Sequence, residues 1–461
     1  MVARPRSVAE LHQLFQADPA QLPAQTEASL RAAELATDRL SAFTCTHPGA
    51  GARAAELAGQ EASDRPLWGV PVSVKDSLHV TGLPRWHGTA MATGKESGFD
   101  SAPVQRLQEA GAVVIGKTSM SEMGLLASGL GSQFPVVRNP WDPTRTPGGS
   151  SSGAGASIAA GVTVAGIGTD IAGSVRLPAA HCGIVALKPT QNTLPYASAS
   201  TWRSAGPMAR TVADARTLFE VVSRTDTSDQ LGFGYDVEPG STRRHLEGLA
   251  GLRVGVMEWP GYGPRMNADT ATLFRRALDL LAGAGAELVD YSLGVTEQDF
   301  AALDRCLMVR GRAEIAAVDP DRVQYLLPQV RDWLDAGPQL SAVDYYRDFE
   351  HLSTRAGQLL TAASQFDLVV SPVMGDHSFP AEDFGPDLSQ SLLYHCGYTA
   401  WWNQTGQPAM SIPMGLAGDG LPVGLQLVAR RRADWSLLDV AEFVEAQLAL
   451  DLEWPDLVVE A

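Results

Sequence analysis

The sequence predicts an α/β protein built on a single large mixed, mostly parallel β-sheet that is covered by helices on both faces. Short apolar runs alternate along the chain with longer segments of helical composition, an order typical of strands joined by crossover helices. The chain has 461 residues, of which 45% are hydrophobic and 19% charged. This balance suits a globular protein with a large core.

The first half of the chain begins this alternation. Ser7 is placed to cap a short helix through Phe15, and residues 25–40 have helical composition without a breaker. Gly111 ends a later helix and precedes an apolar run. We therefore expect strands over 67–74, 112–115 and 162–168, and helices over 102–110 and 154–160.

The second half of the chain repeats the same order. Gly418 and Gly420 flank Asp419, so we expect residues 411–416 and 423–428 to pair as a hairpin across this turn. The other expected elements are strands over 252–257, 287–291 and 366–373, and helices over 268–284, about 297–318, about 342–364 and 435–450.

Two turn-rich segments, 191–204 and 225–241, interrupt these elements. Neither is long enough to separate independent domains. We therefore expect one domain over residues 1–461, made of N-terminal helices over about 7–60, a core over about 65–215, and a second half over about 250–450 that completes the same sheet.

The composition narrows the classes of partner. A net charge of −17 repels phosphate backbones and disfavours nucleic-acid binding. No apolar run is long enough to span a membrane, and the N-terminus does not resemble a signal peptide. The four cysteines are far apart and form no CxxC pair, as in reduced cytoplasmic proteins. We expect a cytoplasmic protein with a small-molecule ligand, and a homo-oligomer is compatible with the sequence.

Two serine-bearing glycine turns lie close together in the sequence. The first is Gly-Gly-Ser-Ser-Ser-Gly at 148–153, and the second is the run from Gly168 to Pro178, which contains Gly173-Ser174. No histidine that could act as a base lies between them. Lys75 ends an apolar strand-like segment upstream. Serines with a basic lysine, in place of a histidine, suggest hydrolysis through a Ser-Ser-Lys relay.

At these residues the chain resembles the amidase signature family. The order and spacing of the matching segments extend over roughly residues 25 to 450. The segments are 66–76, 111–118, 138–142, 147–151, 165–178, 187–190 and 206–214, with a weaker similarity at 403–413 and 420–428.

The resemblance implies a role for each residue of the relay. Ser174 is the nucleophile, Ser150 shuttles protons after a cis peptide bond, and Lys75 is the base. The backbone N–H groups of Ile171, Ala172, Gly173 and Ser174 form the oxyanion hole, a geometry that small residues in a turn permit. The alternatives are an ordinary loop at Ser174 and a helix cap at Ser150 to Ser152.

A lysine acts as a base only when it is neutral, and its ordinary pKa near 10.4 prevents this at pH 7. Burial lowers the pKa because it disfavours the charged form. The apolar residues 68–74 are suited to bury Lys75, and Asp76 is expected to point away from it. The alternative is a strand-end lysine with its ammonium group in solvent.

Several further residues are candidates for support or for the pocket. Asp170 and Arg176 form a scaffold beside the nucleophile, or Arg176 holds a substrate carboxylate. Ser151 supports the first turn. The candidate pocket walls are Gly124, Leu125, Trp202 and Trp402. The nine histidines form no metal-binding pattern, and the expected chemistry needs no cofactor.

Two positions depart from the pattern of the family. Ser152 replaces a glycine of the first turn, and Ala172 replaces a glycine of the second. An alanine keeps its N–H donor and adds a methyl group, which narrows the space near the oxyanion.

The best interpretation is an amidohydrolase that cleaves a linear carboxylic amide through an acyl-serine. The alternatives are the glutaminase subunit of a tRNA-dependent amidotransferase and a hydrolase of a urea-derived amide such as allophanate. A catalytically inactive binding module is another. A nucleotide-binding protein is a further alternative, because residues 111–118 fit the pattern G-x-x-x-x-G-K-[ST]. The apolar residues 112–115 favour a strand there over a phosphate-binding loop.

Overall fold

The computed structural model describes residues 7–60, 64–195, 200–226, 229–235, 243–336, 340–455 and 457. The turn-rich segments 191–204 and 225–241 lie partly outside the described residues. The strands are β1 (Phe43–Thr46), β2 (Pro71–Lys75), β3 (Val113–Thr118), β4 (Ala165–Asp170), β5 (Val185–Lys188), β6 (Ser204–Ala209), β7 (Arg253–Val256), β8 (Glu287–Asp290), β9 (Leu368–Pro372), β10 (Ala409–Leu416) and β11 (Pro422–Ala429).

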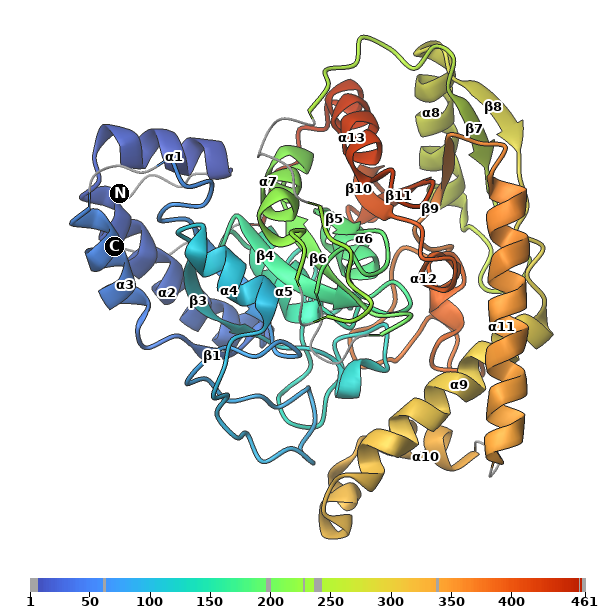
Figure 1. Ribbon diagram of the computed structural model, residues 1–461, viewed down its shortest axis with the longest axis horizontal. Coiled ribbons are helices and arrows are strands. Elements are labelled where there is room, and N and C mark those ends of the chain that lie inside the picture. Colours follow the sequence, from blue (N-terminus) through green and yellow to red (C-terminus); the bar gives the residue numbers. More distant parts are fainter. Residues whose placement is uncertain are drawn as a thin grey trace.

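Helices cover this sheet on both faces and extend beyond its ends (Figure 1). They are α1 (Val8–Ala17), α2 (Gln21–Leu40), α3 (Ala50–Ala58), α4 (Ala102–Glu109), α5 (Ser152–Ala159), α6 (Arg176–Cys182), α7 (Val212–Val222), α8 (Ala268–Gly283), α9 (Glu297–Ala316), α10 (Pro328–Ala336), α11 (Ala342–Ala363), α12 (Trp401–Gln404) and α13 (Asp434–Leu448). Short 3₁₀ turns are η1 (Glu122–Gly124), η2 (Pro320–Tyr325) and η3 (Tyr394–Cys396).

The strands form one mixed sheet in the order β1-β3-β2-β4-β6-β5-β10-β11-β9-β7-β8. This confirms a single large sheet to which both halves of the chain contribute. The expectation that it is mostly parallel is wrong. Among the described strands, β2 pairs in parallel with β3 and β4, and β7 with β8 and β9. The other six neighbouring pairs are antiparallel.

The prediction of a mostly parallel sheet failed because the sequence patterns do not predict two of its strands, β5 and β6. β6 runs antiparallel between β4 and β5. Its sequence, Ser-Ala-Gly-Pro-Met-Ala, has no β-branched residue and contains a proline, so its strand propensity is low. The expected hairpin of residues 411–416 and 423–428 is confirmed, because β10 and β11 pair antiparallel.

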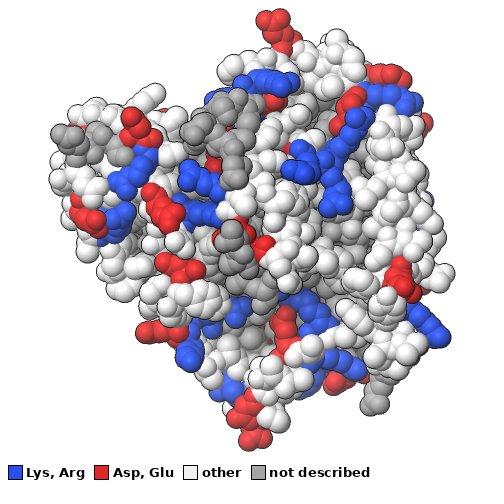
Figure 2. All heavy atoms as spheres, viewed as in Figure 1, with Lys and Arg blue, Asp and Glu red and all other residues white. Residues whose placement is uncertain are grey.

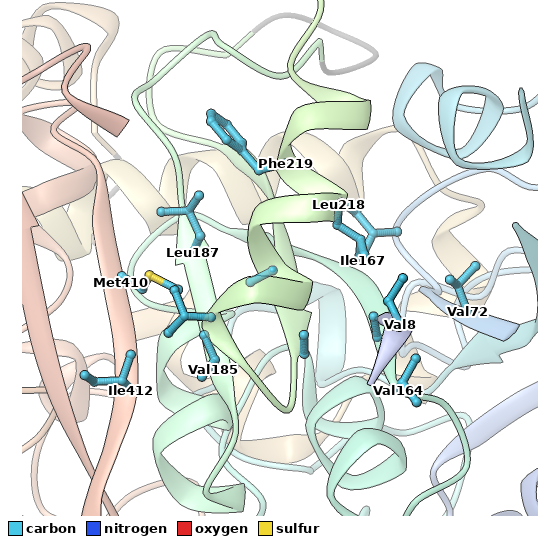
Figure 3. Close-up of a cluster of buried hydrophobic side chains, with 14 of the residues drawn as sticks. Val8, Val72, Val164, Ile167, Val185, Leu187, Leu218, Phe219, Met410 and Ile412 are labelled. Atoms are coloured by element: carbon cyan, nitrogen blue, oxygen red, sulfur yellow. The ribbon is translucent and has the colours of Figure 1, made fainter. Parts of the chain in front are cut away.

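The core lies on both faces of the sheet, and the side chains of β5 show the alternation. Val185 and Leu187 join one buried cluster, and Ala186 joins another on the opposite face. Figure 3 shows Phe219 of α7 near Leu187 and Leu218 near Ile167 of β4. Burying each large side chain of this kind stabilises the fold by about 2 kcal/mol.

The two ends of the molecule differ in what they contribute. Helices α1, α2 and α3 lie at one end, and α9, α10 and α11 lie at the other (Figure 1).

In the described part of the chain, no helix is long and apolar enough to cross a membrane. Acidic and basic side chains are interspersed over the face in Figure 2.

Candidate active site

The parallel pair β2 and β4 brings the two halves of the site together. Val74 lies opposite Ile167, so both strands end at the same edge of the sheet. Lys75 ends β2, Asp170 ends β4, and the turn that carries Ser174 follows directly. This edge is where parallel sheets place functional residues.

Lys75 is fully buried and contacts the first serine turn. Its Nζ donates to Ser150 Oγ at 2.8 Å and to the carbonyl oxygen of Thr169 at 3.2 Å. Burial lowers the pKa of Lys75 to about 7. Asp170 opposes this shift and the positive charge of Arg310 adds to it. A substantial fraction of the amine is therefore neutral at pH 7, unlike a lysine in solvent.

Asp76 points away from Lys75, as expected. Its Oδ1 lies 2.9 Å from Lys117 Nζ, and its Oδ2 accepts from the backbone N–H groups of Trp86 and His87. Lys117 belongs to the segment with the nucleotide-binding pattern. That segment forms β3, and both charged side chains of the pair are fully buried. A buried, paired lysine on a strand does not have the geometry of a phosphate-binding loop.

Ser150 and Ser174 border the same pocket. The peptide bond between Gly149 and Ser150 is cis, as the resemblance implies. The backbone N–H of Ser151 donates to the Ser174 carbonyl oxygen at 3.1 Å, which ties the two turns together. Within the described residues, Ser174 Oγ has no hydrogen-bond partner, the Ser150 hydroxyl included, and Ser174 lines the pocket.

Three of the four expected oxyanion donors have no acceptor within the described residues. These are the N–H groups of Ile171, Ala172 and Ser174. The fourth differs, because the Gly173 N–H donates to Asp170 Oδ1 at 2.8 Å. Gly173 has φ 124°, and a Cβ there would lie 2.2 Å from Thr399 Oγ1, so this position requires glycine.

Asp170 and Arg176 form a bidentate buried ion pair. Arg176 Nε lies 3.1 Å from Asp170 Oδ2, and Nη2 lies 3.0 Å from Oδ1. Burial alone would raise the pKa of Asp170. The charge and hydrogen bonds of Arg176, together with Lys188 and Asn403, outweigh it and hold the pKa at about 2. Arg176 also donates to the Thr399 carbonyl, Gln426 and Asn403. The donors of its guanidinium are thus bonded to groups of the protein core. The alternative that Arg176 holds a substrate carboxylate is therefore wrong.

Ser151 lies at the N-cap position of α5, but its side chain makes no capping bond. Its Oγ instead donates to the Thr169 carbonyl oxygen at 3.3 Å. Thr169 also accepts from Lys75, so the two residues bind the same carbonyl group. Ser152 donates to the Ser128 carbonyl oxygen at 3.2 Å, which explains how a serine fits where the family pattern has glycine.

Two of the four expected pocket residues border the site. Gly124 and Leu125 line the pocket beside Ser174. The other two expected residues, Trp202 and Trp402, do not line the pocket around Ser174. Trp402 is fully buried in the core, and Trp202 packs on Phe349 with ring centroids 5.7 Å apart.

The side of the pocket that comes from the second half of the chain was not predicted from the sequence. Helix α9 contributes Leu307 and Arg310, and Leu393 and Cys396 come from the segment around η3. The facing wall includes Leu126, Ala127 and Ala172. No local motif marks Leu307, Arg310, Leu393 or Cys396, because only the tertiary fold brings them to Ser174. Among the described residues, no group of three or more acidic, histidine or cysteine side chains is placed to hold a metal ion.

Comparisons with known proteins agree with this geometry. A family model described as Amidase matches residues 24–438. The chain is 34% identical over 428 residues to a glutamyl-tRNA(Gln) amidotransferase subunit of Nitratidesulfovibrio vulgaris (strain DP4), covering 86% of this chain and 87% of the relative.

Solved structures share the fold over almost the whole chain. The structure of a 6-aminohexanoate cyclic dimer hydrolase has a TM-score of 0.85 at 25% identity, covering 96% of this chain and 97% of its own. The peptide amidase from Stenotrophomonas maltophilia has a TM-score of 0.81 at 27% identity and covers 96% of each chain.

Proposed function

The chain belongs to the amidase family, and from this premise we propose that it hydrolyses a linear carboxylic amide through an acyl intermediate on Ser174. One observation carries the proposal. A fully buried lysine amine lies 2.8 Å from the hydroxyl oxygen of Ser150, in the pocket that also holds Ser174. An amine with a pKa of about 7 is matched to proton transfer at neutral pH.

The proposed reaction begins with proton transfer along the relay. Neutral Lys75 takes the proton of Ser150 Oγ, and Ser150 takes the proton of Ser174 Oγ. Ser174 Oγ then bonds to the carbonyl carbon of the amide, whose oxygen becomes negatively charged. The N–H groups of Ile171, Ala172 and Ser174 donate to this oxygen, which stabilises the transition state.

The relay then runs in the opposite direction. Lys75 returns its proton through Ser150 to the amide nitrogen, the C–N bond breaks, and ammonia or an amine leaves. Water attacks the ester carbon and loses a proton to the same relay. The C–O bond to Ser174 then breaks, the carboxylic acid leaves, and the relay returns the proton to Ser174 Oγ. The buried Asp170–Arg176 pair holds the turn at Ser174 in place throughout, because Asp170 binds the N–H groups of Gly173 and Val175.

A second candidate function is a glutaminase subunit that supplies ammonia to a tRNA-dependent amidotransferase. The curated relatives favour it over a stand-alone amidase. The protein from N. vulgaris is named as a subunit of glutamyl-tRNA(Gln) amidotransferase. The same name is given to a protein of Symbiobacterium thermophilum (strain DSM 24528 / JCM 14929 / IAM 14863 / T), which is 32% identical over 94% of this chain and 95% of its own. The apolar wall beside Ser174 favours a stand-alone amidase.

Three further predictions accompany the proposal. The first is a cytoplasmic location, the second a small-molecule amide as the ligand, and the third a possible homo-oligomer. A urea-derived amide such as allophanate belongs to the same class of substrate.

The purified chain alone is expected to release ammonia or an amine from at least one small aliphatic or aryl amide. The measurement is product release over a panel of such amides and glutamine, with the Ser174→Ala variant as the control for contaminating activity. Glutamine cleavage only in the presence of partner proteins would favour the second candidate. No release from any amide, with or without partners, would contradict amide hydrolysis.

A further inference from the structure

Two arginine side chains that no step of the proposed reaction uses line the space around Ser174, Arg203 and Arg310. Arg203 lies only on the polar side and has interactions of its own, whereas Arg310 also borders the apolar side. Arg310 of α9 lines both the polar and the apolar part of this space, as do Gly124, Ile171 and Ser174. The remaining wall on the apolar side consists of Leu125, Leu126, Ala127, Ala172, Leu307, Leu393 and Cys396. A cation at the boundary of an apolar slot attracts an anionic group of a bound molecule.

The contacts of Arg310 leave most of its donors available. Its Nη2 lies 2.8 Å from Glu314 Oε1, one helical turn further along α9, and the described residues offer it no other ion pair. The two side chains are 21% and 31% exposed, so the pair is weaker than a buried one. A guanidinium has five N–H donors in a planar fork, which binds a carboxylate in a bidentate manner.

The acidic side chain at the pocket, Asp170, already accepts hydrogen bonds at both of its oxygens. Asp170 Oδ1 accepts from the Gly173 N–H, Arg176 and Asn403, and Oδ2 accepts from Arg176 and the Val175 N–H. The pocket therefore presents positive charge and no available carboxylate. An ammonium group on the substrate would lose its hydration without gaining a carboxylate partner from Asp170.

We propose that Arg310 is a specificity-determining residue, which selects amides whose acyl chain ends in a carboxylate and carries no ammonium group. The proposal rests on the proposed function and names its substrate class. The acyl methylene groups lie along the leucine side chains, and the terminal carboxylate replaces Glu314 as the main partner of the Arg310 fork. A monoamide of a short dicarboxylic acid has this chemistry. Glutamine has the carboxylate but adds an ammonium group.

The test compares matched amides in the wild-type chain. Glutaramate, the neutral pentanamide and glutamine share the reacting amide group and a five-carbon chain. Pentanamide has a methyl group in place of the carboxylate of glutaramate, and glutamine adds an ammonium group beside that carboxylate. We expect kcat/KM for glutaramate to exceed that for pentanamide by about tenfold or more, the effect of one charge-assisted bond. Glutamine is expected to be a poorer substrate than glutaramate.

Substitution of Arg310 then tests the residue itself. Arg310→Gln is expected to lower the ratio of kcat/KM for glutaramate to that for pentanamide by about tenfold, and Arg310→Lys to restore part of it. The ratio is measured at about pH 9, where Lys75 is neutral in each variant. The matched control is Arg312→Gln on the same helix, because Arg312 donates to the Leu334 carbonyl and does not border the pocket. This variant is expected to keep the wild-type ratio.

The outcomes separate this proposal from the proposed function. Equal or better cleavage of pentanamide by the wild-type chain, or an unchanged ratio in Arg310→Gln, would overturn the role of Arg310 and leave amide hydrolysis intact. A preference for glutamine over glutaramate would also overturn it. Cleavage of none of these three amides would overturn the role of Arg310 and leave amide hydrolysis intact if another amide of the panel is cleaved. Cleavage of no amide of the whole panel would contradict the function itself.

Discussion

Replacing Ser174 by alanine is expected to abolish amide turnover while the protein stays folded. The hydroxyl is the proposed nucleophile, and the described residues give its oxygen no hydrogen bond that the fold would lose. We expect kcat to fall by about 10⁴-fold or more, since the oxyanion donors alone supply only residual catalysis. The free energy of unfolding should change by less than about 1 kcal/mol. Product release and a thermal melt measure both.

The control for Ser174→Ala is a serine that is also buried but lies outside the pocket. Ser157 of α5 is buried and donates to the Ala154 carbonyl oxygen at 3.1 Å. Ser157→Ala is expected to keep nearly wild-type turnover. A fluorophosphonate probe should label the wild-type chain and Ser157→Ala at Ser174, and should not label Ser174→Ala. Wild-type turnover in Ser174→Ala would show that the nucleophile has been assigned to the wrong residue.

Replacing Lys75 is expected to have the second largest effect. Lys75→Met removes the amine and keeps an unbranched side chain of similar length in the buried space. Without a base, neither Ser150 nor Ser174 loses its proton, and we expect kcat to fall by about 10³-fold or more. Lys75→Ala should show the same loss of turnover. The measurement is kcat on the best amide of the panel, together with a melt to confirm folding.

A second buried lysine provides the matched control. Lys188 of β5 is also fully buried, and burial lowers its pKa to about 7. Its Nζ donates to the Pro189 carbonyl oxygen at 2.8 Å and to no hydroxyl group in the described part of the chain. Lys188→Met is expected to retain turnover close to that of the wild type. Equal losses in the Lys75 and Lys188 variants would point to a structural effect rather than to a base.

The sequence was most informative where local patterns determine local geometry. The apolar run before Lys75 predicted its burial, and glycines around Ser150 and Ser174 predicted two tight turns. The hairpin of β10 and β11 followed from the turn around Asp419. In each case the residues that decide the structure are within a few positions of one another.

Features that depend on distant parts of the chain escaped prediction. The N–H of Gly173 donates to Asp170. This bond depends on the position of the Asp170 carboxylate, which Arg176 and Asn403 hold in place. Arg310 reaches the pocket from α9, far from the serine turns in the sequence. Low strand propensity concealed β6, and its omission led to the wrong majority orientation of the sheet.

The central claim is that a neutral, buried Lys75 activates the serine pair, and the pH dependence of Ser174 labelling tests it most directly. The rate of reaction with a fluorophosphonate should rise about tenfold per pH unit below about pH 7 and level off above it, since the neutral form of the amine is the active one. Burial holds the pKa of His87, which also borders the pocket, well below 6.5, so it does not produce this transition. In Lys75→Met the rate should be low and independent of pH. A wild-type rate that is constant from about pH 5.5 to about pH 9, or that rises only above about pH 10, would contradict the account.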